Sequence, residues 1–415
     1  MSLAENISER LSYKFYSDGV ITPGSEPDPA SAPGASGAQQ LRFVSQTVSL
    51  AKDTYQSTEK RTDRQIADFR HGTRRAQGAV NGLLSALTYA DWFEAALRGT
   101  WAAGFSGGPS AFTSVAADNS TSKFTLGGGD PVASGLRVGM PIRFTGLSDA
   151  QNNDRVFVVT AIGGANNREV TVYPAPDTMT ADTSFAVAQA GMRVFAPSTG
   201  HVSRKLALES YQDDIDVAIL ATELRLGGFN IGLPASGNAT VDFSLLGRNE
   251  RIYEDTDAPF FSSPTAQTNT GLFTAVNGLL MANGVAVAVL TGLQITLDLA
   301  ANGPAVVGSN LVPEIFLGAA NVTGNFTAFF ENADLIANFQ DEDEISLLAY
   351  VTATNDADPE AMTVYLPRLK LGGAQRGDDG SGGRVVQYPF QALKYVGAGP
   401  GIEQTTIQLC DTEVS

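Results

Sequence analysis

The sequence predicts a mainly β protein with two tandem β-sandwich or barrel domains of one type, each with a short flanking helix, plus a small inserted β domain. Three observations support this prediction. The 415 residues include 43 Gly and 19 Pro, which divide the chain into short segments with strand-like alternation. Several phrases occur twice in the same order. A stretch of about 100 residues interrupts only the first copy.

Two short phrases occur in both halves of the chain. Residues 78–84, GAVNGLL, and residues 324–330, GNFTAFF, share the template Gly, any, large apolar, any, small, apolar, apolar. Residues 224–228, LRLGG, are followed 145 residues later by LKLGG at 369–373. Repeated phrases in a constant order indicate an internal duplication.

The strands that follow the second phrase also agree. Period-2 alternation indicates half-buried strands, and the two sets have the same spacing: Val241, Phe243 and Leu245 in the first copy, Val386, Tyr388 and Phe390 in the second. A weaker match joins LRFVSQT at 41–47, with Leu41 and Phe43, to LQITLDL at 293–299, with Leu293 and Ile295.

Each Gly-x-apolar phrase continues into a helix-like segment. Thr88 and Asp91 are spaced as in a capping box with Asp in place of Glu, and Asn332 is placed to cap the second helix. Helical spacing then predicts an apolar core face on each helix. The predicted core positions are Tyr89, Trp92, Phe93, Ala96 and Leu97 in the first helix, and Leu335, Ile336 and Phe339 in the second.

The segment that interrupts the first copy contains strand phrases such as RVFVVTAI, separated by GGGD, QNND and GGANN. Because Gly and Asn favour turns, we predict a small inserted β domain at 112–190. The first duplicated domain is predicted at 41–101 plus 200–260, and the second at 261–415. Residues 1–40 form an N-terminal arm.

The N-terminal arm has two parts. Its phrase RLSYKFY alternates like a strand, and residues 22–39 form a Pro/Ser/Gly-rich linker. Two interpretations of the strand stay open. It either tethers the chain to a neighbouring subunit or belongs to a frayed arm.

Composition excludes several classes of function. The longest apolar run, VAVAVL at 285–290, is too short for a membrane helix, and the start of the chain lacks a secretion-signal pattern. His71 and His201 have no Cys or His partner at metal-ligand spacing, and Cys410, near the chain end, is a poor candidate nucleophile. We expect no metal, no cofactor, no membrane contact and no catalytic residue.

Two alternative functions were weighed. A secreted or surface-layer β-sandwich binding protein would also be acidic and Gly-rich, but it should carry a secretion signal. A carbohydrate-active enzyme needs convergent carboxylates with aromatic platforms. The adjacent acids of QDDID at 212–216 and QDEDE at 340–344 are typical of solvated runs, and Trp92 and Trp101 are the only tryptophans.

Charge is distributed unevenly along the chain, whose formal net charge is −17. Between Arg251 and Arg368 there are 14 acids and no Lys or Arg, so this part cannot neutralise nucleic-acid phosphates. The segment KRTDRQIADFRHGTRR is instead basic. It is either a nucleic-acid contact, a solvated loop or, as we favour, a self-assembly loop complementary to the acidic half of another copy. Its cations are Lys60, Arg61, Arg64, Arg70, Arg74 and Arg75.

Three stretches resemble the tail tube proteins of long non-contractile-tailed, siphovirus-type bacteriophages. They are RTDRQIADFRHGTRRAQGAVNGLLSALTYADWFEAALRGTW, NVTGNFTAFFENADLIANF and VYLPRLKLGG. The resemblance covers about 41–101 and 201–400, and not clearly 112–190 or the N-terminal arm.

The resemblance implies a structural virion protein rather than an enzyme. In that family, β-sandwiches with one flanking helix join edge to edge into rings, and the rings stack into a tube that conducts the tape measure protein and double-stranded DNA. The duplication favours a trimer with pseudo-sixfold symmetry over a hexamer. Partners would include tail terminator and tail tip proteins, with assembly in the bacterial cytoplasm.

The family resemblance also suggests roles for charged residues. Loops corresponding to 52–77 are implied to reach the adjacent ring, which makes the six basic residues of that loop inter-ring contact candidates. An acidic lumen would keep DNA from adhering to the tube wall. The lumen candidates are Asp298, Glu314, Glu331, Asp341 and Asp343.

Overall fold

The computed structural model describes residues 5, 8–16, 34–287, 290–330, 334–377 and 382–415. Strands dominate these residues, and two α-helices accompany them, which confirms the predicted mainly β fold class. Asn332, Glu331 and most of the 22–39 linker lie outside the described residues.

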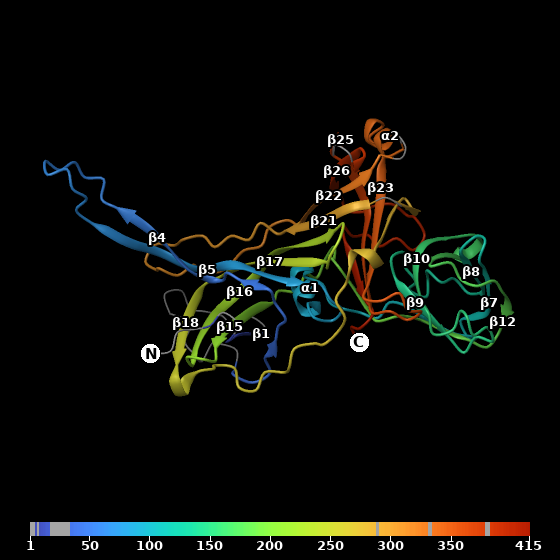
Figure 1. Cartoon of the computed structure of the whole chain (residues 1–415), viewed down its shortest axis with the longest axis horizontal. Coiled ribbons are helices and arrows are strands. Elements are labelled where there is room, and N and C mark those ends of the chain that lie inside the picture. The colour runs from blue at the N-terminus through green and yellow to red at the C-terminus, as the bar shows by residue number, and fades with distance from the viewer. Residues whose placement is uncertain (1–4, 6–7, 17–33, 288–289, 331–333, 378–381) are drawn as a thin grey trace.

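Two groups of strands, here called the first and second units, contain the two sets of repeated phrases (Figure 1). The first unit contains β1 (Glu9–Tyr16), β2 (Gln39–Gln40), β3 (Ser45–Gln46), β4 (Ser49–Gln56), β5 (Phe69–Leu83), α1 (Ala90–Leu97), β15 (Lys205–Gln212), β16 (Val217–Pro234), β17 (Thr240–Gly247) and β18 (Asn249–Glu254). The second unit contains β19 (Leu279–Ala282), β20 (Val285–Ala286), β21 (Leu290–Asp298), β22 (Asn321–Phe329), α2 (Asp334–Gln340), β23 (Glu344–Thr352), β24 (Ala361–Leu371), β25 (Gln375–Arg376), β26 (Val385–Ala392) and β27 (Gln408–Asp411).

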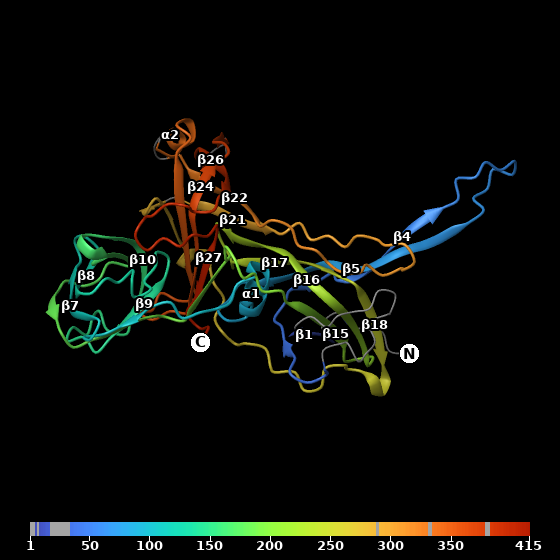
Figure 2. The ribbon, with the colours of Figure 1, turned by 180° about the vertical axis from the view of Figure 1, so that it is seen from behind.

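One continuous sheet, here called the shared sheet, runs through both units in the order β5–β17–β16–β21–β22–β26. The C-terminal part of β16 connects the units, because residues 228–232 pair with β17 on one side and residues 228–234 pair with β21 on the other. Both views show this sheet crossing the middle of the molecule (Figures 1 and 2). The two units are therefore joined by main-chain hydrogen bonds as well as by the connecting chain.

The two units repeat the same strand register. Val80 faces Phe243 in the first unit, and Phe326 faces Tyr388 in the second. The hairpins behind the shared sheet repeat a register shift too, at Leu206/Leu208 in β15–β16 and at Ile345/Leu347 in β23–β24. This agreement supports the interpretation of an internal duplication.

The weaker sequence match does not follow the register. It aligned Leu41 with Leu293. In the second unit Leu293 faces Phe326, whose equivalent in the first unit is Val80. The residue that faces Val80 is Gln46, not Leu41. Leu41 instead donates its backbone N–H to the Leu11 carbonyl, outside the ladder. The apolar alternation of 41–43 therefore packs on β1 rather than extending the strand partner of β5.

The repeated LxLGG phrase lies where a strand leaves one layer for another. Residues 217–222 of β16 pair with β15 and β18, whereas residues beyond Gly228 pair with β17 and β21. The register shifts between Leu226 and Gly228, and a Cβ on Gly228 would lie 2.0 Å from the Leu297 carbonyl oxygen. Strands that switch sheets bend at such bulges, where glycine permits a close backbone approach.

The first helix packs as the sequence predicts, but it begins differently. Tyr89, Trp92 and Phe93 are buried at 3% exposure or less, and the three rings surround Phe243 at centroid distances of 5.2 to 5.5 Å. The predicted capping box is wrong, because the helix has no side-chain cap and the Thr88 hydroxyl bonds Ser85 and Thr268 instead.

The second helix is less buried than expected. Ile336 is buried and Leu335 packs against the core, but Phe339 is 37% exposed rather than inward-facing. The difference arises because α2 lies at the tip of the second unit, beyond the end of β22, whereas α1 lies inside the first unit (Figure 1).

The first and the last described strands both lie inside sheets. The N-terminal strand β1 pairs along its whole length with β15 of the same chain, so it is neither frayed nor, in this structure, a tether to another subunit. Cys410 lies in β27 between β14 (Met192–Phe195) and β24, and its side chain is fully buried. Burial raises the pKa of this thiol to about 11, so the side chain is held inside a sheet as an unreactive thiol.

A separate sheet is formed between Ser106 and Gln189. Its strands are β6 (Ser106–Gly107), β7 (Phe112–Asp118), β8 (Lys123–Gly128), β9 (Pro141–Thr145), β10 (Val156–Gly163), β11 (Glu169–Tyr173), β12 (Met179–Asp182) and β13 (Ala186–Gln189). This inserted sheet shares an apolar cluster with Leu348, Tyr350 and Tyr365 of the second unit. It therefore rests against β23 and β24, behind the shared sheet.

The glycine of each repeated phrase has no space for a side chain. A Cβ on Gly78 would lie 2.5 Å from the Thr47 carbonyl oxygen, and one on Gly324 would lie 2.2 Å from the Gln294 carbonyl oxygen. We expect Gly78→Ala and Gly324→Ala each to lower the free energy of unfolding by about 1–3 kcal/mol, because backbone must shift to admit the methyl group. Gly163→Ala, with no heavy atom within 4 Å of its Cβ, should change it by less than about 0.5 kcal/mol. Urea unfolding that gives the same value for all three variants would contradict this reading.

Asp411 connects the last strand to the turn before α1. Its carboxylate accepts the Leu87 N–H at 2.8 Å, and burial raises its pKa from 3.8 to about 6. Because the folded pKa is raised, the stability that Asp411 contributes is fully present below pH 4 and is lost as the pH rises through 6. When the pH is lowered from 7.5 to 5, the free energy of unfolding of the native protein should rise by about 1 kcal/mol more than that of the Asp411→Asn variant. A difference that is independent of pH in chemical denaturation would disprove the assignment.

Candidate functional site

The two faces of the shared sheet differ in chemistry. On one face, residues such as Phe243, Ile295 and Phe326 are fully buried in the core. Successive residues of a strand point to opposite faces of the sheet. The residues before and after these core positions therefore lie on the opposite face, here called the open face, where no side chain is buried. The open face carries Gln77, Asn81, Asn230, Asp242, Ser244, Gln294, Thr296, Asp298, Asn321, Thr323, Asn325, Gln387 and Gln391.

Side-chain hydrogen bonds connect neighbouring strands across the open face. Asn81 donates to Asp242 at 2.8 Å, Thr296 to Asn230 at 3.1 Å, and Asn325 to Gln294 at 3.2 Å. Gln391 donates to Asn321 at 2.8 Å in the next strand pair. These bonds hold the amides in place across strands, including the strand pair that joins the two units.

The open face contains no cation in the strand segments that form it. Residues 77–83, 228–234, 240–246, 292–298, 321–329 and 385–392 include no Lys or Arg, and their only acids are Asp242 and Asp298. Such a surface offers hydrogen bonds to water without a charge that attracts phosphate.

The five lumen candidates from the sequence do not come together. Asp298 lies on the open face and is exposed. Asp341 and Asp343 are exposed in the loop between α2 and β23, outside the strands of that face. Glu314 is engaged in ion pairs, described below, and Glu331 lies outside the described residues.

Sequence reasoning missed Asp242 and the amide residues of the open face. The alternation of Val241, Phe243 and Leu245 was used to identify a strand, and the same alternation places Asp242 and Ser244 on the other side. The missing information was which strands are neighbours, because only the pairing brings Asn81 to Asp242 and Asn230 to Thr296.

The shared sheet has one unpaired edge in each unit. At the first-unit edge, β3 and β4 pair only with β5 among the described strands. At the opposite edge, β25 pairs only with β26 in the part of the chain that the structure covers. Exposed sheet edges present main-chain donors and acceptors that can pair with another chain.

Two hairpin extensions, here called arms, leave the shared sheet in the same register. The first arm (residues 52–74) connects β4 to β5 and pairs Tyr55 with Arg70. The second arm (residues 299–320) connects β21 to β22 and pairs Asn302 with Phe316. The first arm extends away from the body, whereas the second lies back along the first unit (Figure 1).

The second arm docks on the first unit through both apolar and charged contacts. Leu311, Val312 and Ile315 of the arm are buried at 2% exposure or less. The Asn310 carbonyl accepts the backbone N–H of Arg74 at 2.8 Å, and the Val312 carbonyl accepts Nε of Arg248 at 2.6 Å.

Charged groups of the first unit lie beneath the second arm. Glu314 of the arm pairs with Lys205 at 3.3 Å and with Arg225 at 3.0 Å. Below it, Glu223 pairs with Arg248 at 2.8 Å and with Lys205 at 3.6 Å. Lys205, Glu223 and Arg248 are 2% to 3% exposed, so the arm excludes water from this cluster.

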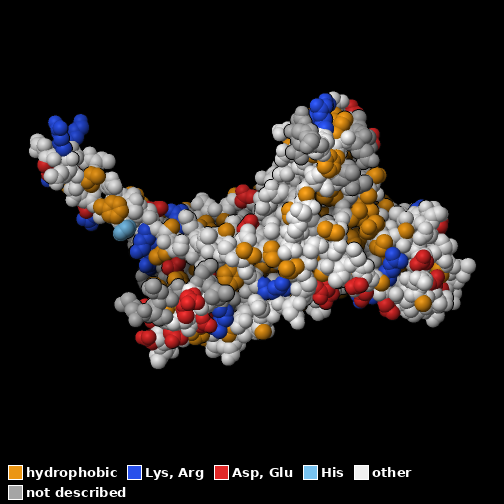
Figure 3. Space-filling model, in the orientation of Figure 1, with side chains coloured by type: hydrophobic (Ala, Val, Ile, Leu, Met, Phe, Trp, Pro, Cys, Tyr) orange, Lys and Arg blue, Asp and Glu red, His pale blue; other side chains and the backbone are white. Residues whose placement is uncertain are grey.

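The six basic candidates all lie on or at the base of the first arm. Three have partners within it: Arg61 with Asp63, Arg70 with Asp68, and Arg75 with Asp53, at 2.8 to 2.9 Å. Arg74 contacts the second arm through its backbone. Among the described residues, Lys60 and Arg64 have no ion pair and are exposed at the tip, where Figure 3 shows basic side chains.

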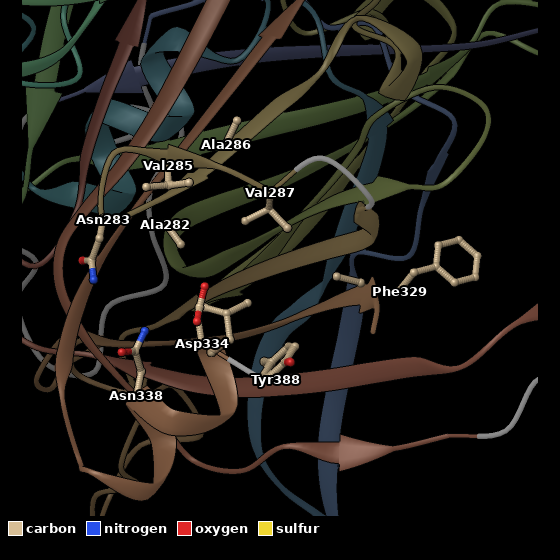
Figure 4. Close-up of a pocket in the computed structure, with 11 residues that line it drawn as sticks. Ala282, Asn283, Val285, Ala286, Val287, Phe329, Asp334, Asn338 and Tyr388 are labelled. Carbon is tan, nitrogen blue, oxygen red and sulfur yellow. The ribbon is translucent and has the colours of Figure 1, made fainter. Parts of the chain in front are cut away.

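A pocket of about 220 Å³ lies between α2, the β19–β20 hairpin and the ends of β22 and β26. Figure 4 shows Asp334 and Asn338 of α2 facing Val287 and Tyr388. Asp334 is the single carboxylate among the described lining residues, so they do not form the carboxylate pair of a glycoside hydrolase.

No helix among the described residues is long and apolar enough to span a bilayer. No group of three or more His, Cys, Asp or Glu side chains within them is arranged to hold a metal ion.

The fold and its surfaces define a β-rich structural protein whose distinctive features are an open polar sheet face, two unpaired sheet edges and two arms. The sequence matches the phage tail tube protein family over residues 10–392, and the chain belongs to this family. It is thus a tail tube component of a bacteriophage virion, which confirms the resemblance seen in the sequence. No curated protein matches the chain.

The buried cluster beneath the second arm gives a stability prediction. Glu223→Gln removes the carboxylate between Lys205 and Arg248, leaving buried cations underpaired, so we expect about 3 kcal/mol or more of destabilisation. Asp68→Asn, which breaks the exposed pair with Arg70, should have no measurable effect. Unfolding by urea tests both. Equal midpoints for the two variants would show that the cluster does not hold the arm in place.

Proposed function

We propose that the chain assembles into closed rings that stack into the hollow phage tail tube, the conduit for the tape measure protein and the double-stranded DNA genome. One observation carries the proposal. The shared sheet already joins two equivalent units edge to edge at β16–β21, and it ends at two unpaired edges of the same kinds, β3–β4 and β25. A head-to-tail interface of this type closes into a ring when its rotation permits.

Three copies per ring are favoured. Each copy contributes two units, so a trimer places six units around the ring with pseudo-sixfold symmetry. A hexamer would place twelve and would require a wider ring. The repeated register of the two units supports the view that both occupy similar positions in the wall.

In this proposal the open face of the shared sheet lines the lumen. Its amides and hydroxyls offer no cation to bind phosphate, and Asp242 and Asp298 repel it at short range. Asp298 thus keeps the lumen role suggested by the sequence, and Asp242 joins it. Asp341, Asp343 and Glu314 lie outside these strands, and we assign them no lumen role.

The inserted sheet is placed on the outside of the tube. It rests on β23 and β24, the layer behind the shared sheet, so an inward open face directs the insertion outward. Three statements stay predictions from the family. They are the role of the six basic residues between rings, the contacts with the tape measure, tail terminator and tail tip proteins, and assembly in the host cytoplasm.

Electron microscopy and light scattering of the purified full-length protein test the proposal. We expect rings or tubes with an empty centre, and a ring mass of three chains. A gold-binding tag inserted at residues 165–167, in the inserted sheet, should label the outer surface only. A protein that stays monomeric at every concentration and salt condition, or one that forms a flat lattice, would overturn the proposed function.

A further inference from the structure

The first arm exposes side chains that the second arm buries. Tyr55, Ile66 and Phe69 are 51% to 64% exposed along it, and Lys60 and Arg64 stand at its tip. Figures 1 and 3 show the arm projecting from the body with apolar and basic side chains on its surface. In the second arm, which has the same hairpin register, three apolar side chains are buried against the neighbouring unit.

The second unit carries a surface equivalent to the one that receives the second arm. Lys205 precedes Leu206 and Glu223 precedes Leu224, and these leucines are partners across β15–β16. In the same way Glu344 precedes Ile345 and Arg368 precedes Leu369, which are partners across β23–β24.

The equivalent charged pairs of the two units differ in the order of their charges and in their exposure to solvent. Lys205–Glu223 in the first unit corresponds to Glu344–Arg368 in the second, so cation and anion have exchanged places. The first-unit pair is 2% to 3% exposed beneath the second arm, whereas Glu344 is 43% and Arg368 27% exposed. Next to Glu344 stand three more exposed acids, Asp341, Glu342 and Asp343.

We propose that the first arm of one copy docks on the second unit of the next copy, over Glu344 and the acids 341–343, as the second arm docks on the first unit within one chain. This inference rests on the proposed ring assembly and specifies its lateral junction. The partner is a second copy of this chain. In the shared hairpin register, the exposed Ile66 and Phe69 stand where Val312 and Ile315 of the second arm are buried on the first unit. Asp68, at the position of Glu314, is paired with Arg70 of its own arm, which leaves Lys60 and Arg64 as the charges that the acids beside Glu344 can attract.

The same equivalence specifies the strand register at the junction. Gln375 faces Gln387 as Asn230 faces Asp242, and Ser49 faces Gln77 as Thr296 faces Thr323. Because Asn230 pairs with Thr296 inside the chain, Gln375 of one copy pairs with Ser49 of the next. The β25 edge then continues into the β3–β4 edge.

Reversed polarity selects the order of units. The corresponding surface of a first unit carries the cations Lys205, Arg225 and Arg248, and the second arm of the same chain already covers it. Lys60 and Arg64 of a first arm therefore find no acidic surface there. Specificity of this kind combines attraction at the correct surface with repulsion at the wrong one. First and second units therefore alternate around the ring.

A charge-swap experiment tests the docking surface. Lys60→Glu with Arg64→Glu should raise the concentration for assembly at least about tenfold, and Asp341→Lys with Asp343→Lys should do the same. Combining all four changes should restore assembly to near the native level. Lys123→Glu with Arg168→Glu, which changes the net charge equally but lies in the inserted sheet, should assemble normally.

The outcomes separate this inference from the proposed function. Native protein that never forms rings would end the proposed function itself. Native tubes together with unchanged assembly of the arm variant would overturn only the docking proposal. Single rings that no longer stack would also overturn it, because they would assign Lys60 and Arg64 to contacts between rings.

Engineered disulfides test the register in the assembled protein. Ser49→Cys with Gln375→Cys should form intermolecular disulfides under mild oxidation and give covalent trimers on non-reducing gels, since directly opposed strand residues suit disulfide geometry. Thr54→Cys with Gln375→Cys, five residues out of register, should give few. The native Cys410 is fully buried and does not interfere. Equal cross-linking by both pairs would refute the register.

Discussion

The ladder between β16 and β21 is the interaction on which the rest of the structure depends. Seven residue pairs from Gly228 to Pro234 join the two units through main-chain hydrogen bonds. Without it, each unit would have a short sheet with one more open edge. With it, core residues of both units form one apolar cluster, from Trp92 in α1 to Tyr388 in β26. The junction also fixes the direction in which the sheet can grow.

This ladder requires backbone to come very close to backbone, which explains the chemistry of the repeated phrases. At Gly228 of this ladder a Cβ would collide with the Leu297 carbonyl, and at the equivalent positions Gly78 and Gly324 it would collide with a carbonyl of the neighbouring segment. The feature that the two copies share at Gly78 and Gly324 is therefore a steric requirement at the strand contacts. Side chains outside these contacts are free to differ, and the opposite polarity of Lys205–Glu223 and Glu344–Arg368 is one such difference.

Much of the fold could be predicted from the sequence because local signals were strong. Period-2 alternation identified β17 and β26, and repeated glycines located equivalent strands. The start of α1 was misjudged because the Thr88 hydroxyl bonds the nearby Ser85 and also Thr268, which lies 180 residues further along the chain. The candidate surfaces were harder still. Whether an acid such as Glu314 faces a lumen or an ion pair depends on where an arm folds, which no local pattern encodes.

The cis docking of the second arm has a consequence for the kinetics of assembly. Within each chain, one junction forms during folding, at the high effective concentration that a covalent connection provides. For an assembly closed through the two remaining edges, only every second joint needs a bimolecular encounter. Parity follows as well, because each added molecule brings two wall segments and an odd number of segments cannot occur. In the proposed ring, half of the joints between wall segments would therefore lie within single chains, at β16–β21.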